Sequence, residues 1–250
     1  MEDRKRTILA IIIACVVLLA VLYSFGLNLF NKPPQLELPD SEAVSSGAQG
    51  SANPEAGGIP VEVTPQTVQS VVASLSRYES YSRTVSITYE QDGAVLGTVT
   101  AQVWVDSGWT RTDATLSSGM VEHSIVGDGQ LWLWYNSSTV VHTAPAGVGS
   151  ADLTQRVPTY EEVLDLDPDG ITRADYVQLD GQNCIYVEFE QEELGYLYRY
   201  WIAVDSGLLV AAETQADGDV VYSMTSRDMS SPITGAQDRF VLPDGTSLRD

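Results

Sequence analysis

Residues 84–105, TVSITYEQDGAVLGTVTAQVWV, carry the alternation of polar and apolar side chains on which the fold prediction rests. Val85, Ile87 and Tyr89 alternate with polar residues before Asp92-Gly93. After it, apolar residues recur at alternate positions, namely Val99, Ala101, Val103 and Val105. A period of two is typical of a β-strand with one buried face, and Asp-Gly tolerates the positive φ of tight turns. The stretch therefore predicts two antiparallel strands joined by a short connection.

The apolar faces also predict the length of that connection. A two-residue turn would place Ile87 opposite Thr98, which mixes an apolar with a polar face, whereas a five-residue loop over 90–94 pairs Val85 with Val99. Because a shift of one residue turns every side chain to the other face of a strand, we expect the longer loop.

Similar turns recur along the chain and predict that the strands continue as an antiparallel meander of eight or more. They are Asp-Gly or Asp-Ser-Gly sequences at 106–108, 128–129, 180–181, 205–207 and 217–218.

Two helices are predicted beside these strands. Thr64-Pro65 is a helix start, and valines at helical spacing follow it, which indicates a helix over 66–77. The T-x-x-E sequence at 159–162 has the pattern of a capping box and predicts a second helix over 160–166. The fold class is therefore predicted as α+β: one curved antiparallel sheet with helices against its aliphatic face.

A membrane segment is predicted ahead of this domain. Residues 7–27, TILAIIIACVVLLAVLYSFGL, are uncharged and follow Arg4-Lys5-Arg6. About 20 apolar residues span a bilayer as a helix, and basic residues stay on the cytoplasmic side. The run is longer than the core of a cleaved signal peptide. Lipoprotein processing at Cys15 is the other alternative, although the chain stays apolar beyond it.

The predicted organisation is thus a cytoplasmic stub (1–6), a single transmembrane helix (7–30) and a tether (31–63) before the folded domain (64–250). The tether is rich in Pro, Ser, Gly and acidic residues and has too little apolar content to bury. The predicted location is the cell membrane, with the N-terminus in the cytoplasm and the domain outside it, and the bilayer is a partner through residues 7–30.

Composition excludes several classes of function. The chain of 250 residues has a formal net charge of −21, which disfavours nucleic acid as a partner. It has two histidines and two cysteines, and neither a G-x-S-x-G sequence nor a phosphate-binding glycine loop. We therefore predict a protein that is not an enzyme and that needs no metal or cofactor.

The strands predict two different faces. Aliphatic residues occupy one phase of the alternation, and Trp104, Trp132, Trp134 and Trp201 occupy the other among polar side chains. One interpretation is that each indole packs under a loop or a long side chain. The other is that these four tryptophans form a surface for a protein partner, because tryptophan is enriched at interfaces.

Four stretches, in order, resemble the outer-membrane lipoprotein carrier superfamily of the LolA/LolB type. They are AQVWVDSGWTRTD (101–113), HSIVGDGQLWLWYNSSTVVHTA (123–144), YWIAVDSGLLVAAETQADGDVVYSM (200–224) and FVLPDGTSLRD (240–250). The last is similar to a closing F-x-x-P-x-G-x-x-V-x-D sequence, with leucine in place of the valine.

The resemblance implies an incomplete β-barrel whose concave, aliphatic side lies under helices and receives acyl chains. On that basis, the residues expected to line the ligand are Val85, Ile87, Val103, Val105, Leu133 and Phe189. The predicted function is a membrane-anchored, extracytoplasmic domain that holds a lipid or lipoprotein acyl chain. The alternative is a sensory or interaction module that fills its own cavity and binds another envelope protein.

Overall fold

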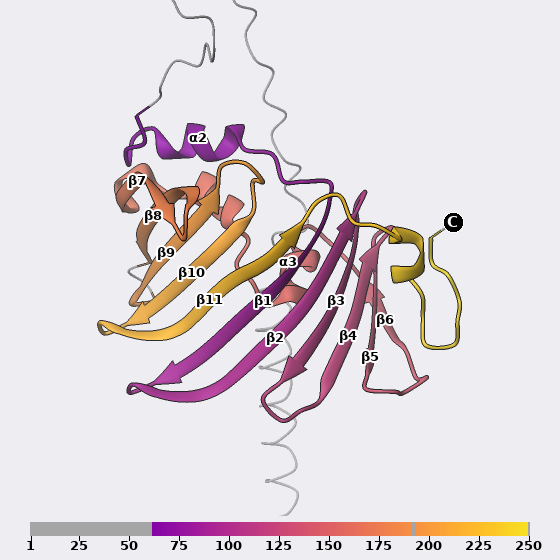
Figure 1. Ribbon diagram of the computed structural model, residues 1–250. Helices are drawn as coiled ribbons and strands as arrows, with labels where there is room; N and C mark the ends of the chain where they lie inside the picture. Colours follow the sequence, from indigo (N-terminus) through magenta and orange to yellow (C-terminus); the bar gives the residue numbers. More distant parts are fainter. Residues whose placement is uncertain (1–61, 192–193, 250) are drawn as a thin grey trace, which may run out of the picture. The chain divides into compact units, whose positions relative to one another are not determined.

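The alternating segments form strands of a single sheet (Figure 1). The computed structural model describes residues 62–191 and 194–249, so the predicted membrane helix at 7–30 and nearly all of the tether at 31–63 lie outside the described residues. Within those ranges, no helix combines the length and the apolar character that crossing a membrane requires.

The sheet has eleven strands in the order β6-β5-β4-β3-β2-β1-β11-β10-β9-β8-β7, and all neighbouring strands are antiparallel. They are β1 (Ser80–Gln91), β2 (Ala94–Asp106), β3 (Trp109–Leu116), β4 (Val121–Gly127), β5 (Gln130–Tyr135), β6 (His142–Pro145), β7 (Ile171–Leu179), β8 (Gln182–Gln191), β9 (Tyr196–Ala203), β10 (Leu209–Ala216) and β11 (Asp219–Ser230).

Two meanders, β1–β6 and β7–β11, lie side by side because the first and last strands pair with each other. The sheet is bent but not closed: β6 and β7 form its two edges. The chain passes from one edge to the other through α3 (Ser150–Gln155) and two 3-10 helices, η2 (Tyr160–Asp165) and η3 (Pro168–Gly170). The predicted curved, antiparallel meander is confirmed.

We call the sheet face that packs against α2 (Val68–Ser74) and η2 the inner face, and the opposite one the outer face. The main core lies on the inner face, where Val68 and Val72 of α2 pack with Val85 and Ile87 of the sheet. Burying one such side chain stabilises a fold by roughly 1.5–3 kcal/mol. The hydrophobic effect thus accounts for the aliphatic phase of the sequence pattern.

The predicted five-residue loop at 90–94 is wrong. The structure has the two-residue turn at Asp92-Gly93, with Gln91 paired to Ala94, and a β-bulge next to it between Tyr89 and Glu90. The bulge shifts the register, so that Ile87 faces Val99 after all. An irregularity in the strand pairing therefore aligns the apolar faces that we expected a longer loop to align.

The predicted helices are shorter than expected. The first spans Val68–Ser74 rather than 66–77, because the backbone becomes extended at Leu75 and takes Arg77 toward other partners. The second is a 3-10 helix, and its Thr159 side chain makes no capping hydrogen bond. Instead, the Thr159 hydroxyl donates to Asp152 at 3.2 Å. The predicted capping box at 159–162 is therefore wrong.

Candidate functional site

The inner face is the predicted ligand face, and the pairing of strands defines its rows. Val85 lies opposite Ala101, which lies opposite Ala114. One row over, Arg83 faces Val103, and the row continues through Thr112, Ser124 and Leu133. Apart from Arg83, these rows are thus aliphatic over β1 and β2, and the second row bears small polar side chains over β3 and β4.

The structure brings five of the six predicted ligand residues together. Val85, Ile87, Val103 and Phe189 are buried in one cluster, and Val105 packs against it. Leu133 lies on the same face at β5 but is half-buried and outside that cluster. The space above the four buried residues is occupied by side chains of the chain itself, namely Val68, Val72, Tyr160 and Val163.

These covering elements, α2, α3 and η2, form a lid that polar contacts tie together. The Gln69 side chain on α2 donates to the carbonyl oxygens of Val163 and Leu166, at 3.0 and 2.9 Å. Tyr160 reaches past the lid and donates to the Gly207 carbonyl at 2.7 Å. Gly207 has φ +60°, and a Cβ there would lie 2.3 Å from the Ser76 carbonyl oxygen, so the approach of the two chains requires glycine.

The strongest of these ties is an ionic latch formed by Arg77, Asp152 and Glu161. The guanidinium makes two hydrogen bonds to Asp152, at 2.7 and 2.9 Å, and two to Glu161, at 2.7 and 2.6 Å. It also lies 4.8 Å from the centre of the Tyr160 ring. Burial alone would lower the pKa of Arg77, but the two carboxylates more than offset it and the pKa is raised. The latch thus joins the segment after α2 to both α3 and η2.

A second arginine lies under the lid, on the sheet itself. Arg83 of β1 is 3% exposed, and its guanidinium donates to the Leu209 carbonyl at 2.8 Å and to the Gln155 side-chain oxygen at 2.6 Å. Burial lowers the pKa of Arg83, and no carboxylate contacts the guanidinium to offset this effect. The side chain nevertheless stays charged, since arginine is protonated at any physiological pH.

A groove of about 500 Å³ opens beside the latch. Tyr81, Val105 and Thr110 of the sheet and Ala151, Asp152 and Gln155 of α3 are among the residues that line it. Known small-molecule sites have volumes of about 300–1,000 Å³. The groove is therefore large enough for part of an acyl chain, and Val105 connects it to the buried cluster.

The outer face carries the predicted tryptophans, and the chain covers most of them itself. Trp132 and Trp134 pack in a second cluster with Trp109, Ile125 and Phe240. Phe240 belongs to the C-terminal strap, residues 231–249, and is fully buried. Arg239 of the strap lies 5.0 Å from the centre of the Trp104 ring. The interpretation that each indole packs under a loop or a long side chain describes Trp104, Trp132 and Trp134.

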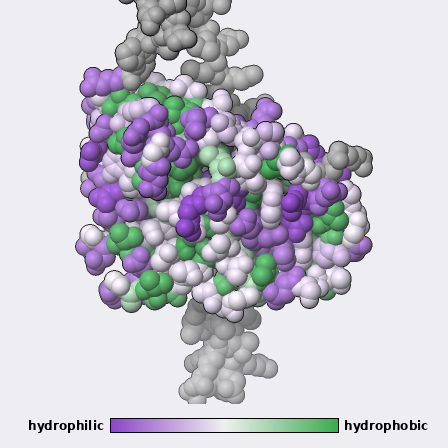
Figure 2. Space-filling view, in the orientation of Figure 1, coloured by the Kyte–Doolittle hydropathy of each residue, from purple (hydrophilic) through white to green (hydrophobic). Residues whose placement is uncertain are grey.

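Trp201 lies apart from the other three. Its ring packs against Tyr186 at 5.1 Å, beside a small cluster of Cys184, Ala203 and Val210. The four tryptophans therefore do not form one continuous surface. In Figure 2, hydrophobic residues on the visible face form separate patches among hydrophilic ones.

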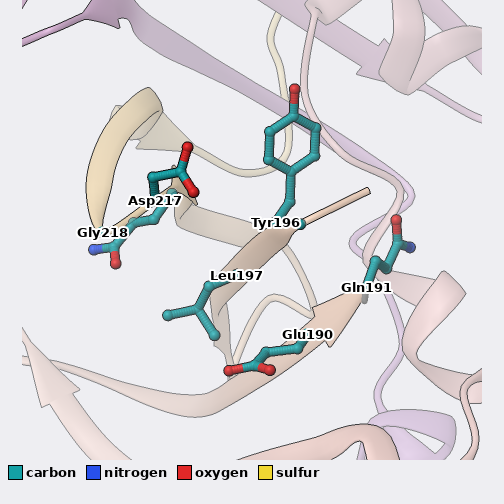
Figure 3. A pocket seen from close by; sticks show the side chains of 8 residues that line it. Glu190, Gln191, Tyr196, Leu197, Asp217 and Gly218 are labelled. Atoms are coloured by element: carbon teal, nitrogen blue, oxygen red, sulfur yellow. The ribbon is translucent and has the colours of Figure 1, made fainter. Parts of the chain in front are cut away.

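A second hollow lies at the tips of the last hairpins. Glu190 and Leu197, which lie opposite each other on β8 and β9, are among the residues that line it, together with Asp217 (Figure 3). Among the described residues, no group of three or more His, Cys, Asp or Glu side chains is placed to hold a metal ion. The part of this hollow that the structure describes therefore offers no metal site.

Sequence reasoning missed the charged part of this site. Arg83 occupies the inward phase of an apolar alternation, two residues before Val85, and that position is the one signal by which it could have been found. Asp152 and Gln155 belong to α3, a six-residue helix without a periodic apolar pattern. Their meeting with Arg77 and Arg83 depends on the crossing between the sheet edges.

No protein-family model matches the sequence, and no curated protein matches it. Several solved structures are nevertheless similar to this chain. An uncharacterized conserved protein from Thermus thermophilus is similar at 12% identity and a TM-score of 0.49, over 74% of this chain and 100% of that one.

A LolA superfamily protein from Nitrosomonas europaea is similar at 10% identity and a TM-score of 0.33, over 70% of this chain and 97% of that one. The superfamily predicted from the sequence motifs is thus among the similar structures. The lipoprotein LppX of Mycobacterium tuberculosis is similar at 17% identity and a TM-score of 0.39, over 68% of this chain and 94% of that one.

Proposed function

We propose that the protein is a membrane-anchored, extracytoplasmic binding domain that holds an apolar ligand, a lipid or a lipoprotein acyl chain, on the inner face of its half-barrel. The observation that carries the proposal is the lid: short elements cover an aliphatic face and are tied to each other by polar contacts. Residues 7–30 would supply the anchor and the bilayer would be the source or the destination of the ligand.

The proposal requires the lid to move, because lid side chains fill the space above Val85 and Phe189. Water can replace the hydrogen bonds of the latch, whereas the aliphatic face exposed by opening would need an apolar cover. An acyl chain supplies that cover. The groove beside Val105 gives the chain a place to enter while the lid is still closed.

The latch provides a direct test. Replacing Arg77 by Gln removes the charge that joins Asp152 and Glu161, and every 1.4 kcal/mol lost from the closed state makes the open state about tenfold more populated. We expect the full-length Arg77→Gln protein, in a non-ionic detergent, to take up a fluorescent fatty acid about tenfold faster than the wild type. Native mass spectrometry of the same samples would show the bound lipid.

The matched control is Arg173→Gln. Arg173 also pairs with a carboxylate, Asp175, but at 3.5 Å and with both side chains at least half exposed. We expect uptake by this variant to equal that of the wild type. Equal uptake by Arg77→Gln and the wild type would contradict the proposed role of the lid.

A second candidate function rests on the same filled space. If Val68, Val72, Tyr160 and Val163 are permanent core residues, the domain is an interaction module whose partner is another envelope protein. Absence of bound lipid from wild type and Arg77→Gln alike, under all loading conditions, would favour this function over lipid binding.

A further inference from the structure

Arg83 is an unusual residue for an apolar sheet face. Among the described residues, the buried charged side chains are Arg83, on the sheet, and Asp152, on the lid. Removing a guanidinium from water is costly unless a negative charge and hydrogen bonds compensate. A carboxylate in contact with Arg83 would be the usual solution.

The contacts of Arg83 are neutral instead. Its partners are the Leu209 carbonyl and the side-chain amide oxygen of Gln155, and its buried Nε has no partner. The Thr112 hydroxyl, in the same row beyond Val103, is buried without a partner as well. Two unsatisfied polar groups therefore flank one valine on the predicted ligand face.

Asp152, the buried carboxylate of the lid, binds other residues than Arg83. Asp152 accepts two hydrogen bonds from Arg77 and one from Thr159. Asp152 and Gln155 both belong to α3, so a movement of α3 away from the sheet removes both from Arg83. The arginine would keep the Leu209 carbonyl and the Tyr81 ring, whose centre lies 5.8 Å from the guanidinium carbon. An open inner face would then present the positive charge of Arg83 beside aliphatic side chains.

We propose that the ligand is an anionic amphiphile, whose oxyanion headgroup, a carboxylate or a phosphate, replaces Gln155 on Arg83 while its chain lies along Val85 and Ile87. The inference rests on the proposed function and deepens it. Guanidinium groups bind carboxylate and phosphate through paired hydrogen bonds, and the Nε that is unsatisfied in the closed structure would gain an acceptor. The groove, which reaches Gln155 from outside, gives the headgroup its path.

The test compares three ligands with the same chain: dodecanoate, dodecyl phosphate and dodecanol. Each is titrated calorimetrically into the full-length protein at one fixed concentration of a non-ionic detergent. Hydrogen bonds to charged groups are strong enough to change affinity by about ten- to a hundredfold, so both anions should bind at least about tenfold more tightly than the alcohol. The tighter of the two anions identifies a fatty acid or a phospholipid as the source of the headgroup.

Two variants assign this preference to Arg83. Arg83→Met removes the charge and should bring all three ligands within about twofold of each other. Gln155→Glu supplies a carboxylate that competes for Arg83 and also strengthens the closed lid, so it should weaken both anions more than dodecanol and reduce the preference. This variant decides the question if Arg83→Met fails to fold. Arg227→Met, at an exposed arginine of β11 that contacts Ser86, is the matched control and should keep the preference.

Equal affinity of the wild type for dodecanol and the two anions would overturn the proposed headgroup site and leave lipid binding intact. No binding of any of the three would overturn the proposed function itself, and the headgroup site with it. An unchanged preference in Gln155→Glu would also contradict the assignment to Arg83.

Discussion

The packing of Trp109 over Gly127 gives the sharpest prediction about stability. A Cβ on Gly127 would lie 2.2 Å from Cε3 and 2.3 Å from Cδ2 of the Trp109 ring. Real Cβ atoms do not approach ring atoms so closely, and Gly127→Ala must therefore displace the indole. The ring is 8% exposed and contacts Trp132 and Phe240, with ring centres 5.9 and 5.8 Å away, so it has little room to move.

The cost can be worked out from these contacts. Overpacking a core typically costs about 1–3 kcal/mol, and each aromatic pair is worth about 0.5–1.5 kcal/mol beyond its buried area. Partial loss of the two pairs puts the expected loss in the free energy of unfolding at about 2–4 kcal/mol. For a domain of this size the melting temperature should fall by about 5–15 °C.

The assay is thermal unfolding of the full-length chain in a non-ionic detergent, followed by near-ultraviolet circular dichroism of the tryptophans. Gly170→Ala is the matched control, because a Cβ there meets no atom within 4 Å, and it should change stability by less than about 0.5 kcal/mol. Adding Trp109→Leu to Gly127→Ala should relieve the clash, so that the double variant loses less than the sum of the two single losses. A Gly127→Ala protein that melts within a degree of the wild type would refute the described packing of the outer face.

Three further predictions concern titration, thiol reactivity and topology. Burial raises the pKa of Glu162 above its ordinary 4.5, so just above pH 4.5 the folded state holds a proton that the unfolded state has released. The stability from this group therefore falls as the pH rises from 4.5 through the pKa of the folded state, and Glu162→Gln should flatten this part of a pH series of melting curves. Burial, together with the charge of Asp205, raises the pKa of the Cys184 thiol to about 11. In a Cys15→Ser background, alkylation of Cys184 at pH 8 should therefore occur only on unfolding, and rapid labelling of the folded protein would contradict the described environment. Protease treatment of intact cells or spheroplasts should remove the domain, whereas a mature N-terminus beyond residue 20 or a lipidated Cys15 would contradict the predicted anchor at 7–30.

The strands could be predicted from the sequence because their alternation reflects burial on one side of the sheet. Val85, Ile87 and Val103 do point to the core, and their period of two needed no further information. The loop predicted at 90–94 is wrong because a bulge at Leu96 changes the register: Glu90 pairs with Val95, but Tyr89 pairs with Gly97. Its sequence signal is the adjacent apolar pair Val95-Leu96 before Gly97, which interrupts the period of two. The rule of matching faces held, but the structure satisfies it by another route.

The charged site could not be predicted because its members meet only through the tertiary fold. Arg77 and Asp152 are 75 residues apart, and Arg83 and Gln155 are 72 apart. No local pattern links such pairs, and α3, which supplies both lid partners, has no sequence signal of its own. The alternation does place Arg83 on the inward phase, but the role of its charge depends on which hydrogen-bond acceptor lies opposite it in the folded protein.

The two faces of the sheet are covered in physically different ways, and the difference indicates where a ligand can exchange. On the outer face, Phe240 packs into aromatic rings, and its removal would expose apolar surface that no solvent contact repays. On the inner face, Val68, Val72, Tyr160 and Val163 also pack on the sheet, but the covering elements are in addition held to each other by polar contacts. These contacts are the latch and the hydrogen bonds from Gln69, which water can replace. An acyl chain would cover the apolar surface that the lid leaves behind, and its headgroup would neutralise the charge of Arg83. We therefore expect the lid on the inner face to open when a ligand supplies both an apolar chain and a negative charge. The strap on the outer face should stay in place.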